Sequence, residues 1–266
     1  MLSEFLTIGV LGGMGPEATN RLCARITQLT PAARDQEHIP VICYNNPRIP
    51  SRLDAVVHDA HSPLPELIRT ARVLEAAGAN FLVLPCNSAH TYLAELQASV
   101  GIAIINMVDE VARAIRREMP EIREVGVMAS TPTINNRLYH EALADQYIEI
   151  NVPTEEQQEQ VIEAIHGEHG VKAGFIIEPA RILTTIGEQI MSTGAEAIVV
   201  GCTEISVAFA QHPPAFKCID SLDVLARVAV EKATKGIYSD GKYPLHSSRR
   251  RRRVHSRLSG IEVQRR

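Results

Sequence analysis

Short apolar segments alternate with amphipathic segments along the chain, and the alternation runs through two successive halves. The first half predicts strands and helices in turn: Leu6–Leu11, Glu17–Thr30, Ile39–Tyr44, Pro65–Ala77, Phe81–Leu84, Thr91–Ser99, Ile102–Ile105 and Val108–Met119. The second half predicts Val125–Met128, Thr131–Leu143, Tyr147–Ile150, Glu155–Glu168, Ala173–Thr193, Ala197–Val200, Ile205–Phe209 and Phe216–Ile219. This alternation is typical of an α/β protein with mostly parallel sheets that are covered by helices on both faces.

The two halves can be aligned with each other. Residues 8–11 match 125–128 at an offset of 117, residues 83–87 match 199–203 at 116, and residues 105–109 match 219–223 at 114. Three matches in the same order indicate an internal duplication. We therefore predict two pseudo-symmetric open α/β domains of about 110 residues each, which is an ordinary domain size. The first comprises residues 1–106 and 221–236, the second residues 107–220, and residues 237–266 form a basic tail.

Composition excludes several classes of protein. No apolar run reaches the roughly 20 residues that a membrane-spanning helix needs, so we expect no membrane partner. The N-terminal segment carries Glu4 where a signal peptide would be basic, which predicts a cytoplasmic protein. Residues 249–266 hold eight arginines and one acid, which leaves a formal net charge of −11 on the rest of the chain. Such an acidic body argues against nucleic-acid binding, although the Arg249–Arg253 run can attract anions.

Two of the five cysteines occupy equivalent positions in the repeat. Cys86 and Cys202 each follow a buried strand at its carboxyl end, where open parallel sheets bind ligands. Two facing domains would bring both thiols to one cleft. We expect Cys23, Cys43 and Cys218 to be core thiols, and the odd number and wide spacing predict neither a disulfide framework nor a metal site.

A pair of thiols on opposite walls of a cleft suits one kind of chemistry. Inverting a carbon requires one group to remove a proton from one face and another to return a proton to the other face. A free thiol has a pKa of about 8.5, so both its forms are accessible near neutral pH. Asn87 and Thr203, which follow the cysteines, can donate hydrogen bonds to a carboxylate. Gly12–Pro16, which includes Met14, lets the backbone approach a ligand closely.

Six segments resemble the cofactor-independent aspartate/glutamate racemase family, most closely its aspartate branch. They are IGVLGGMGPEAT (8–19), YNNPRIPSR (44–52), LPCNSAH (84–90), PTEEQQ (153–158), GVKAG (170–174) and VVGCTEIS (199–206). The resemblance extends from about residue 7 to about residue 235. The chain differs in having Ser88 where many relatives have threonine, and in its arginine-rich C-terminus.

The resemblance implies two flavodoxin-like domains with an active-site cleft between them, assembled as a homodimer. It implies racemisation of a small acidic amino acid, aspartate in particular, without pyridoxal phosphate, metal or any other cofactor. Cys86 and Cys202 would form the catalytic acid/base pair. The expected substrate-binding residues are Met14, Arg52, Asn87, Ser88, Thr131, Thr133, Lys172, Thr203 and Glu204.

Several alternatives stay open at this level. Glu204 can orient Cys202 or simply favour the first turn of a helix, and His90 can be a helper base or a packed side chain. The activity can be that of a glutamate, hydantoin or broad-specificity racemase, or of a maleate-type isomerase. A two-lobed binding module without chemistry would need the cleft and the cations, but not two thiols.

Overall fold

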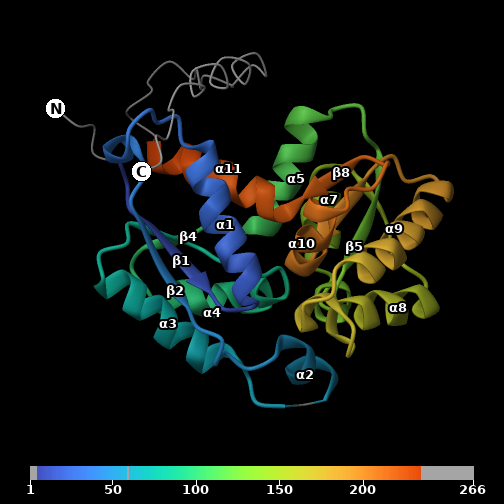
Figure 1. Cartoon of the computed structure of the whole chain (residues 1–266), viewed down its shortest axis with the longest axis horizontal. Helices are drawn as coiled ribbons and strands as arrows, with labels where there is room; N and C mark the ends of the chain where they lie inside the picture. Colours follow the sequence, from blue (N-terminus) through green and yellow to red (C-terminus); the bar gives the residue numbers. More distant parts are fainter. Residues whose placement is uncertain (1–4, 59, 235–266) are drawn as a thin grey trace, which may run out of the picture.

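Two four-stranded parallel sheets organise the computed structural model, which describes residues 5–58 and 60–234 (Figure 1). The first sheet has the order β2-β1-β3-β4, with β1 at Ile8–Gly12, β2 at Val41–Asn45, β3 at Phe81–Val83 and β4 at Ala103–Ile104. The second has the equivalent order β6-β5-β7-β8, with β5 at Glu124–Ala129, β6 at Glu149–Asn151, β7 at Ile198–Gly201 and β8 at Cys218–Asp220. Both sheets have the strand order 2-1-3-4 within their own half, which matches the first four strands of the flavodoxin-like order 2-1-3-4-5. The predicted fold class is confirmed.

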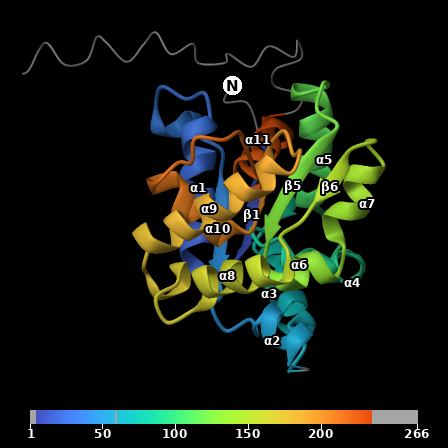
Figure 2. The ribbon, with the colours of Figure 1, turned by 90° about the vertical axis from the view of Figure 1, so that its right-hand side faces the viewer.

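Helices cover both faces of each sheet (Figures 1 and 2). The longer ones are α1 (Pro16–Leu29), α3 (Leu64–Ala76), α5 (Met107–Glu118), α8 (Glu155–His166), α9 (Ile177–Ser192), α10 (Thr203–Gln211) and α11 (Ser221–Thr234). The shorter ones are α2 (Arg52–Val57), α4 (Leu93–Ala98), α6 (Thr131–Asn135) and α7 (Leu138–Ala144), together with 3-10 turns at Asp35–Glu37, Ser88–Tyr92 and Val171–Ala173. None of the helices in the described part of the chain is both long and apolar enough to cross a membrane.

Two helices are exchanged between the halves. Helix α5 follows β4 of the first sheet, yet Val111 and Ile115 pack with Val125 and Val127 of the second. Helix α11 follows β8 of the second sheet, yet most of its buried residues pack with β1 and β3 of the first. Figure 1 shows α11 running from the second sheet back to α1. This packing supports the proposed division into residues 1–106 with 221–236 and residues 107–220, which stays a prediction.

Local signals in the sequence correctly mark several helix ends. Pro16 begins α1, where its missing N–H costs no hydrogen bond. Gly78 follows α3 with a φ of +97°, a left-handed conformation that glycine adopts without strain. The chain can then turn directly into β3.

Some expected elements differ from the structure. The helix expected at 131–143 is split into α6 and α7 because Arg137 adopts a left-handed conformation, with a φ of 53°. The helix expected at 173–193 begins only at Ile177, because Gly174 ends a 3-10 turn with a φ of 93°. Helices α2 and α11 had no counterpart among the expected segments. The basic tail lies outside the described residues.

The expectation of three core thiols was wrong for Cys43. Its side chain is exposed because β2 is the edge strand of its sheet, whereas Cys23 and Cys218 are partly buried. Strand alternation places Val41 on the same side of β2, and Val41 packs with Cys23 of α1 in one apolar cluster. The two thiols of Cys23 and Cys43 interact with each other.

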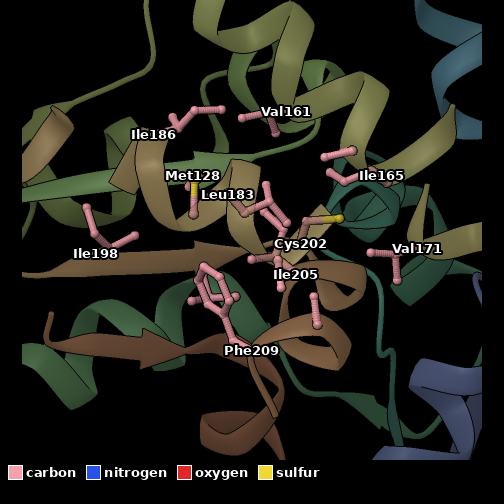
Figure 3. Packing of buried hydrophobic residues seen from close by; sticks show 14 of the residues in the cluster. Met128, Val161, Ile165, Val171, Leu183, Ile186, Ile198, Cys202, Ile205 and Phe209 are labelled. Atoms are coloured by element: carbon pink, nitrogen blue, oxygen red, sulfur yellow. The ribbon is translucent and has the colours of Figure 1, made fainter. Parts of the chain in front are cut away.

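The second half builds a core directly behind one of the candidate catalytic thiols (Figure 3). Helices α8 and α9 bury Val161, Ile165, Leu183 and Ile186 against β5 and β7. Cys202 closes this cluster at the end of β7. Packing on this face therefore supports the strand end from which the thiol projects.

A matched pair of substitutions in α9 tests the burial of this helix. Ile186 is 0% exposed and Ile177 is 72% exposed. We expect Ile186→Ala to lower the free energy of unfolding by about 2–5 kcal/mol, because apolar contacts are lost and a cavity remains. Ile177→Ala should cost less than about 0.5 kcal/mol. Urea unfolding of both variants gives the comparison, and equal losses would contradict the orientation of the helix.

Candidate active site

The carboxyl ends of the strands border a cleft with two adjoining cavities. The inner cavity, about 30 Å³, is lined by Met14, Ser51, Arg52, Leu53, Cys86, Asn87, Ser88, Ser130, Pro132, His166, Lys172, Gly201, Cys202 and Glu204. The outer cavity, about 430 Å³, is lined by Gly13–Ala18, Pro47, Ile49, Ser51, Arg52, His166, Val171, Lys172, Glu204 and Val207. Six residues line both. The inner cavity has room for about one water molecule, so an amino acid that reaches both thiols must extend into the outer one.

Cys86 approaches the inner cavity from the first sheet. It lies just beyond β3, is 5% exposed, and its Sγ is 3.5 Å from the Ser88 hydroxyl. A 3-10 turn follows it at Ser88–Tyr92, so the helix expected from Thr91 begins only at Leu93. The thiol therefore faces the cavity from a short, buried polar turn.

His90 holds this turn in place. The amide N–H of Met107 donates to His90 Nε2 (3.1 Å), so Nδ1 carries the ring proton and donates to the carbonyl of Cys86 (2.9 Å). Burial lowers the pKa of the imidazole and keeps it neutral. With both ring nitrogens engaged, the packed role for His90 is favoured over that of a helper base.

Cys202 approaches from the second sheet, in an environment unlike that of Cys86. It is 7% exposed and occupies the N-cap position of α10 without a side-chain capping hydrogen bond. Its thiol donates to Glu204 Oε2 (3.2 Å), and Glu204 Oε1 accepts from Lys172 Nζ (2.7 Å). Burial, and then the charge of Glu204, raise the pKa of the Cys202 thiol well above its usual value. Cys202 is therefore protonated in this arrangement.

Glu204 connects the thiol to a cation. Burial opposes ionisation of its carboxyl, but the Lys172 ammonium and the Cys202 hydrogen bond outweigh burial and hold its pKa below the ordinary value. Glu204 is thus an anion that faces the cleft and orients Cys202. Lys172, one of the two cations expected to recognise substrate, is already paired with it.

Arg52 supplies the second cation, from the first turn of α2. Its Nη1 donates to the carbonyl of Pro50 (2.8 Å) and its Nη2 to that of Met14 (3.4 Å). Its buried Nε has no hydrogen-bond partner among the described residues. The guanidinium is therefore held against the loop that contains Met14 and retains capacity for an anion.

Asn87 and Thr203 are both buried, and both already form hydrogen bonds within the protein. The amide of Asn87 donates to Ser221 Oγ (3.1 Å), and its carbonyl accepts from Tyr139 (2.6 Å). One amide N–H of Asn87 is left for a ligand. Thr203 Oγ1 is 3.3 Å from Glu204 Oε2.

The turn that contains Thr131 and Thr133 reaches the inner cavity through Ser130 and Pro132 instead. Thr133 is buried with its hydroxyl near that of Ser130, and Thr131 accepts from Gln158. Ser130 was not anticipated, although the repeat offset of 117 pairs it with Gly13 of the glycine loop.

His166 is a second residue that the sequence did not single out. It ends α8 and lines both cavities. Burial and the charge of Lys172 lower its pKa to about 4, so the imidazole is neutral near pH 7. Its position follows from how α8 meets the cleft, for which the local sequence carries no signal.

Two buried thiols, two cations and one anion thus line the inner cavity between two α/β halves, and Glu17 adds a second anion in the outer cavity. No group of three His, Cys, Asp or Glu side chains within residues 5–58 and 60–234 is arranged to hold a metal ion. The arrangement can bind a small anion and exchange protons with it from two sides. Fold and site together define an α/β protein with two thiols on one cavity at the carboxyl ends of its strands.

Comparison with known proteins identifies the family. The family model Asp/Glu/Hydantoin racemase matches residues 11–229. The chain belongs to this family, and the expected isomerase class is confirmed at that level. The broad specificity amino-acid racemase RacX of Bacillus subtilis (strain 168) is 27% identical over 84% of this chain and 96% of its own length.

Solved structures agree with the fold. The aspartate racemase of Picrophilus torridus superimposes with a TM-score of 0.77 and 26% identity, covering 86% of this chain and 94% of its own. The glutamate racemase isoform RacE1 of Bacillus anthracis gives a TM-score of 0.62 at 18% identity, covering 90% and 85%. The latter likeness concerns the fold alone.

Replacement of Glu204 tests its electrostatic link with Cys202. In Glu204→Gln the negative charge beside the thiol is gone, so the pKa of Cys202 should fall while burial still holds it high. We expect alkylation of Cys202 by iodoacetamide at neutral pH to rise about tenfold, the effect of losing ~1.4 kcal/mol of repulsion. Peptide mass spectrometry measures the rate. Glu17→Gln, in the same cleft, is the control and should leave the rate unchanged.

Proposed function

We propose that the protein is a cofactor-independent racemase that interconverts L- and D-aspartate through Cys86 and Cys202. The observation that carries this proposal is the placement of both repeat-related thiols on one inner cavity. One thiolate removes the α-proton, and the thiol on the other wall protonates the opposite face. The name of the Picrophilus torridus relative supports aspartate as substrate.

The two cysteines take different roles in this mechanism. The Cys202 thiol keeps its proton and donates a hydrogen bond to Glu204, so it acts as the acid in the resting enzyme. Cys86 then acts as the base. After one turnover Cys86 carries the abstracted proton and Cys202 is the thiolate, so Cys202 is the base of the reverse reaction. A shift of Lys172 from Glu204 towards Cys202 would favour this thiolate.

The carbanion formed at the α-carbon is the unstable species of the reaction. With no cofactor as electron sink, hydrogen-bond donors arranged around the α-carboxylate must stabilise it. The first N–H groups of α10 and the remaining amide N–H of Asn87 are suitable donors. In a buried cleft such donors act more strongly than in water.

The cations favour an acidic side chain. Arg52 and Lys172 line both cavities, so they can meet a carboxylate that extends from the inner cavity into the outer one. Around the inner cavity, Glu204 and a neutral His166 leave a surplus of one positive charge, because Glu17 lines only the outer cavity. A neutral or apolar side chain would not use this surplus.

A broad-specificity racemase is the second candidate. The outer cavity of about 430 Å³ is large for aspartate, and Pro47, Ile49 and Val207 give it an apolar wall. The name of the Bacillus subtilis relative also points this way. A racemase or isomerase for glutamate, hydantoin or maleate-type substrates would use the same two thiols. A binding module without chemistry would need neither thiol. Substrate profiling separates these possibilities.

A homodimer and a cytoplasmic location remain part of the proposal. Both follow from the family resemblance and from the sequence. Light scattering on the purified chain tests the first.

Single cysteine replacements test the two-thiol mechanism. We expect Cys86→Ser and Cys202→Ser each to lower racemisation of aspartate by about 10²- to 10⁴-fold, the usual contribution of a positioned acid or base. Proton NMR with L-aspartate in D2O follows loss of the α-proton, and chiral chromatography follows D-aspartate.

Cys218→Ser is the matched control, because Cys218 lies in β8 and lines neither cavity. It should retain activity. Exchange of the α-proton of another amino acid, but not of aspartate, would change the assigned substrate and leave the proposed mechanism intact. No exchange with any amino acid, in folded and reduced protein, would refute the racemase proposal.

The charge preference has its own test. We expect Arg52→Gln to raise the KM for aspartate about tenfold or more, because loss of ~1.4 kcal/mol of binding gives that factor. Arg48→Gln, an exposed neighbour in the same loop, should leave KM unchanged. A wild-type preference for alanine over aspartate would contradict the role of Arg52.

A further inference from the structure

Tyr139 in α7 lies between the two strand ends that carry the candidate catalytic thiols. Its side chain is only 1% exposed, and its residue type is the largest among the fully buried side chains of the described chain. Nothing in the mechanism above uses it. It comes from the second half of the chain, beyond the left-handed residue Arg137.

The hydroxyl of Tyr139 reaches the loop of Cys86. It donates to Asn87 Oδ1 at 2.6 Å, and Asn87 directly follows Cys86. Both groups are buried, so water cannot replace the bond, and a carbonyl left unpaired there is costly. The amide of Asn87 also donates to Ser221, the first residue of α11. The Cys86 loop of the first half is thus tied to two elements of the second.

The ring of Tyr139 meets the loop of Cys202. A Cβ atom placed on Gly201 would lie 3.1 Å from Cε2 of the ring and 2.9 Å from Cβ of Ala129. Gly201 directly precedes Cys202 and lines the inner cavity. A glycine at this point lets the ring and the end of β7 come close together.

We propose that Tyr139 is a positioning residue that sets the separation of Cys86 and Cys202 across the inner cavity. Its ring fixes the Cys202 side and its hydroxyl, through Asn87, the Cys86 side. Proton transfer on two faces of one carbon needs both thiols within reach at once, and displacements of about 1 Å can cost about a hundredfold in rate. This inference rests on the proposed two-thiol reaction.

Tyr139→Phe separates positioning from packing, because it removes the hydroxyl and keeps the ring. We expect kcat for aspartate racemisation to fall about ten- to a hundredfold. KM should change less than about threefold, because the contacts of Arg52 and Lys172 are untouched. Tyr44→Phe is the matched control, since it also loses a hydrogen bond, from Arg69 at 3.1 Å, but lies outside the cleft.

A second measurement does not depend on racemase activity. The freed Cys86 loop should make Cys86 several-fold more reactive towards iodoacetamide in Tyr139→Phe, while Cys202, still held by the ring, keeps its wild-type rate. Peptide mass spectrometry resolves the two sites. If the wild type racemises no amino acid, the proposed function fails, and the labelling still tests the positioning role.

Unchanged kcat and unchanged Cys86 labelling in folded Tyr139→Phe would overturn the proposal and leave Tyr139 an ordinary core residue. If that variant does not fold, Ser221→Ala replaces it, because it removes the other anchor of Asn87 and keeps Tyr139. The expected result is again faster labelling of Cys86 alone. If Cys86 and Cys202 are each labelled in Ser221→Ala at their wild-type rates, the result would count against the proposal.

Discussion

Helices α5 and α11 each leave one sheet and bury their apolar faces against the other. Ile115 of α5 lies in the core of the second sheet and Leu225 of α11 in that of the first, and both are 0% exposed. Neither sheet can therefore cover its faces without chain from the other half. Because all pairings are parallel, each half presents its strand carboxyl ends at one edge. The exchange holds those two edges together, and the cleft with its two thiols is the result.

Within this nearly symmetric frame the two thiols are treated differently. The Cys202 thiol donates a hydrogen bond to Glu204, whose charge is balanced by Lys172. Cys86 instead faces the Ser88 hydroxyl, in a turn that a neutral His90 holds in place. An anion beside one thiol and not the other gives the two thiols unequal surroundings. A symmetric fold thus supplies the two-sided geometry, and a few polar side chains supply the asymmetry that the proposed proton transfer uses.

Much of this could be anticipated from local patterns. The strands, the equivalence of Cys86 and Cys202, and the glycine that ends α3 follow from periodicity, repetition and backbone preference. The break between α6 and α7 at Arg137 could not be anticipated, because nothing in a helical pattern indicates that an arginine will adopt a left-handed conformation. Residues 221–236 were placed with the first half, but no helix was expected there, and the packing of α11 on that half depends on contacts distant in sequence. The exposure of Cys43 depends on strand order, since only an edge strand leaves that face open.

The sequence by itself determined the α/β class, the duplication and the residue types at the two strand ends, because these depend on short-range periodicity and on spacing. Tertiary structure decided which groups meet in the cleft. It paired Lys172 with Glu204, brought His166 to the cavity wall, and placed Tyr139 between the two thiol loops. Such contacts join segments tens of residues apart. Their geometry is set by how helices pack on sheets, which no local pattern encodes.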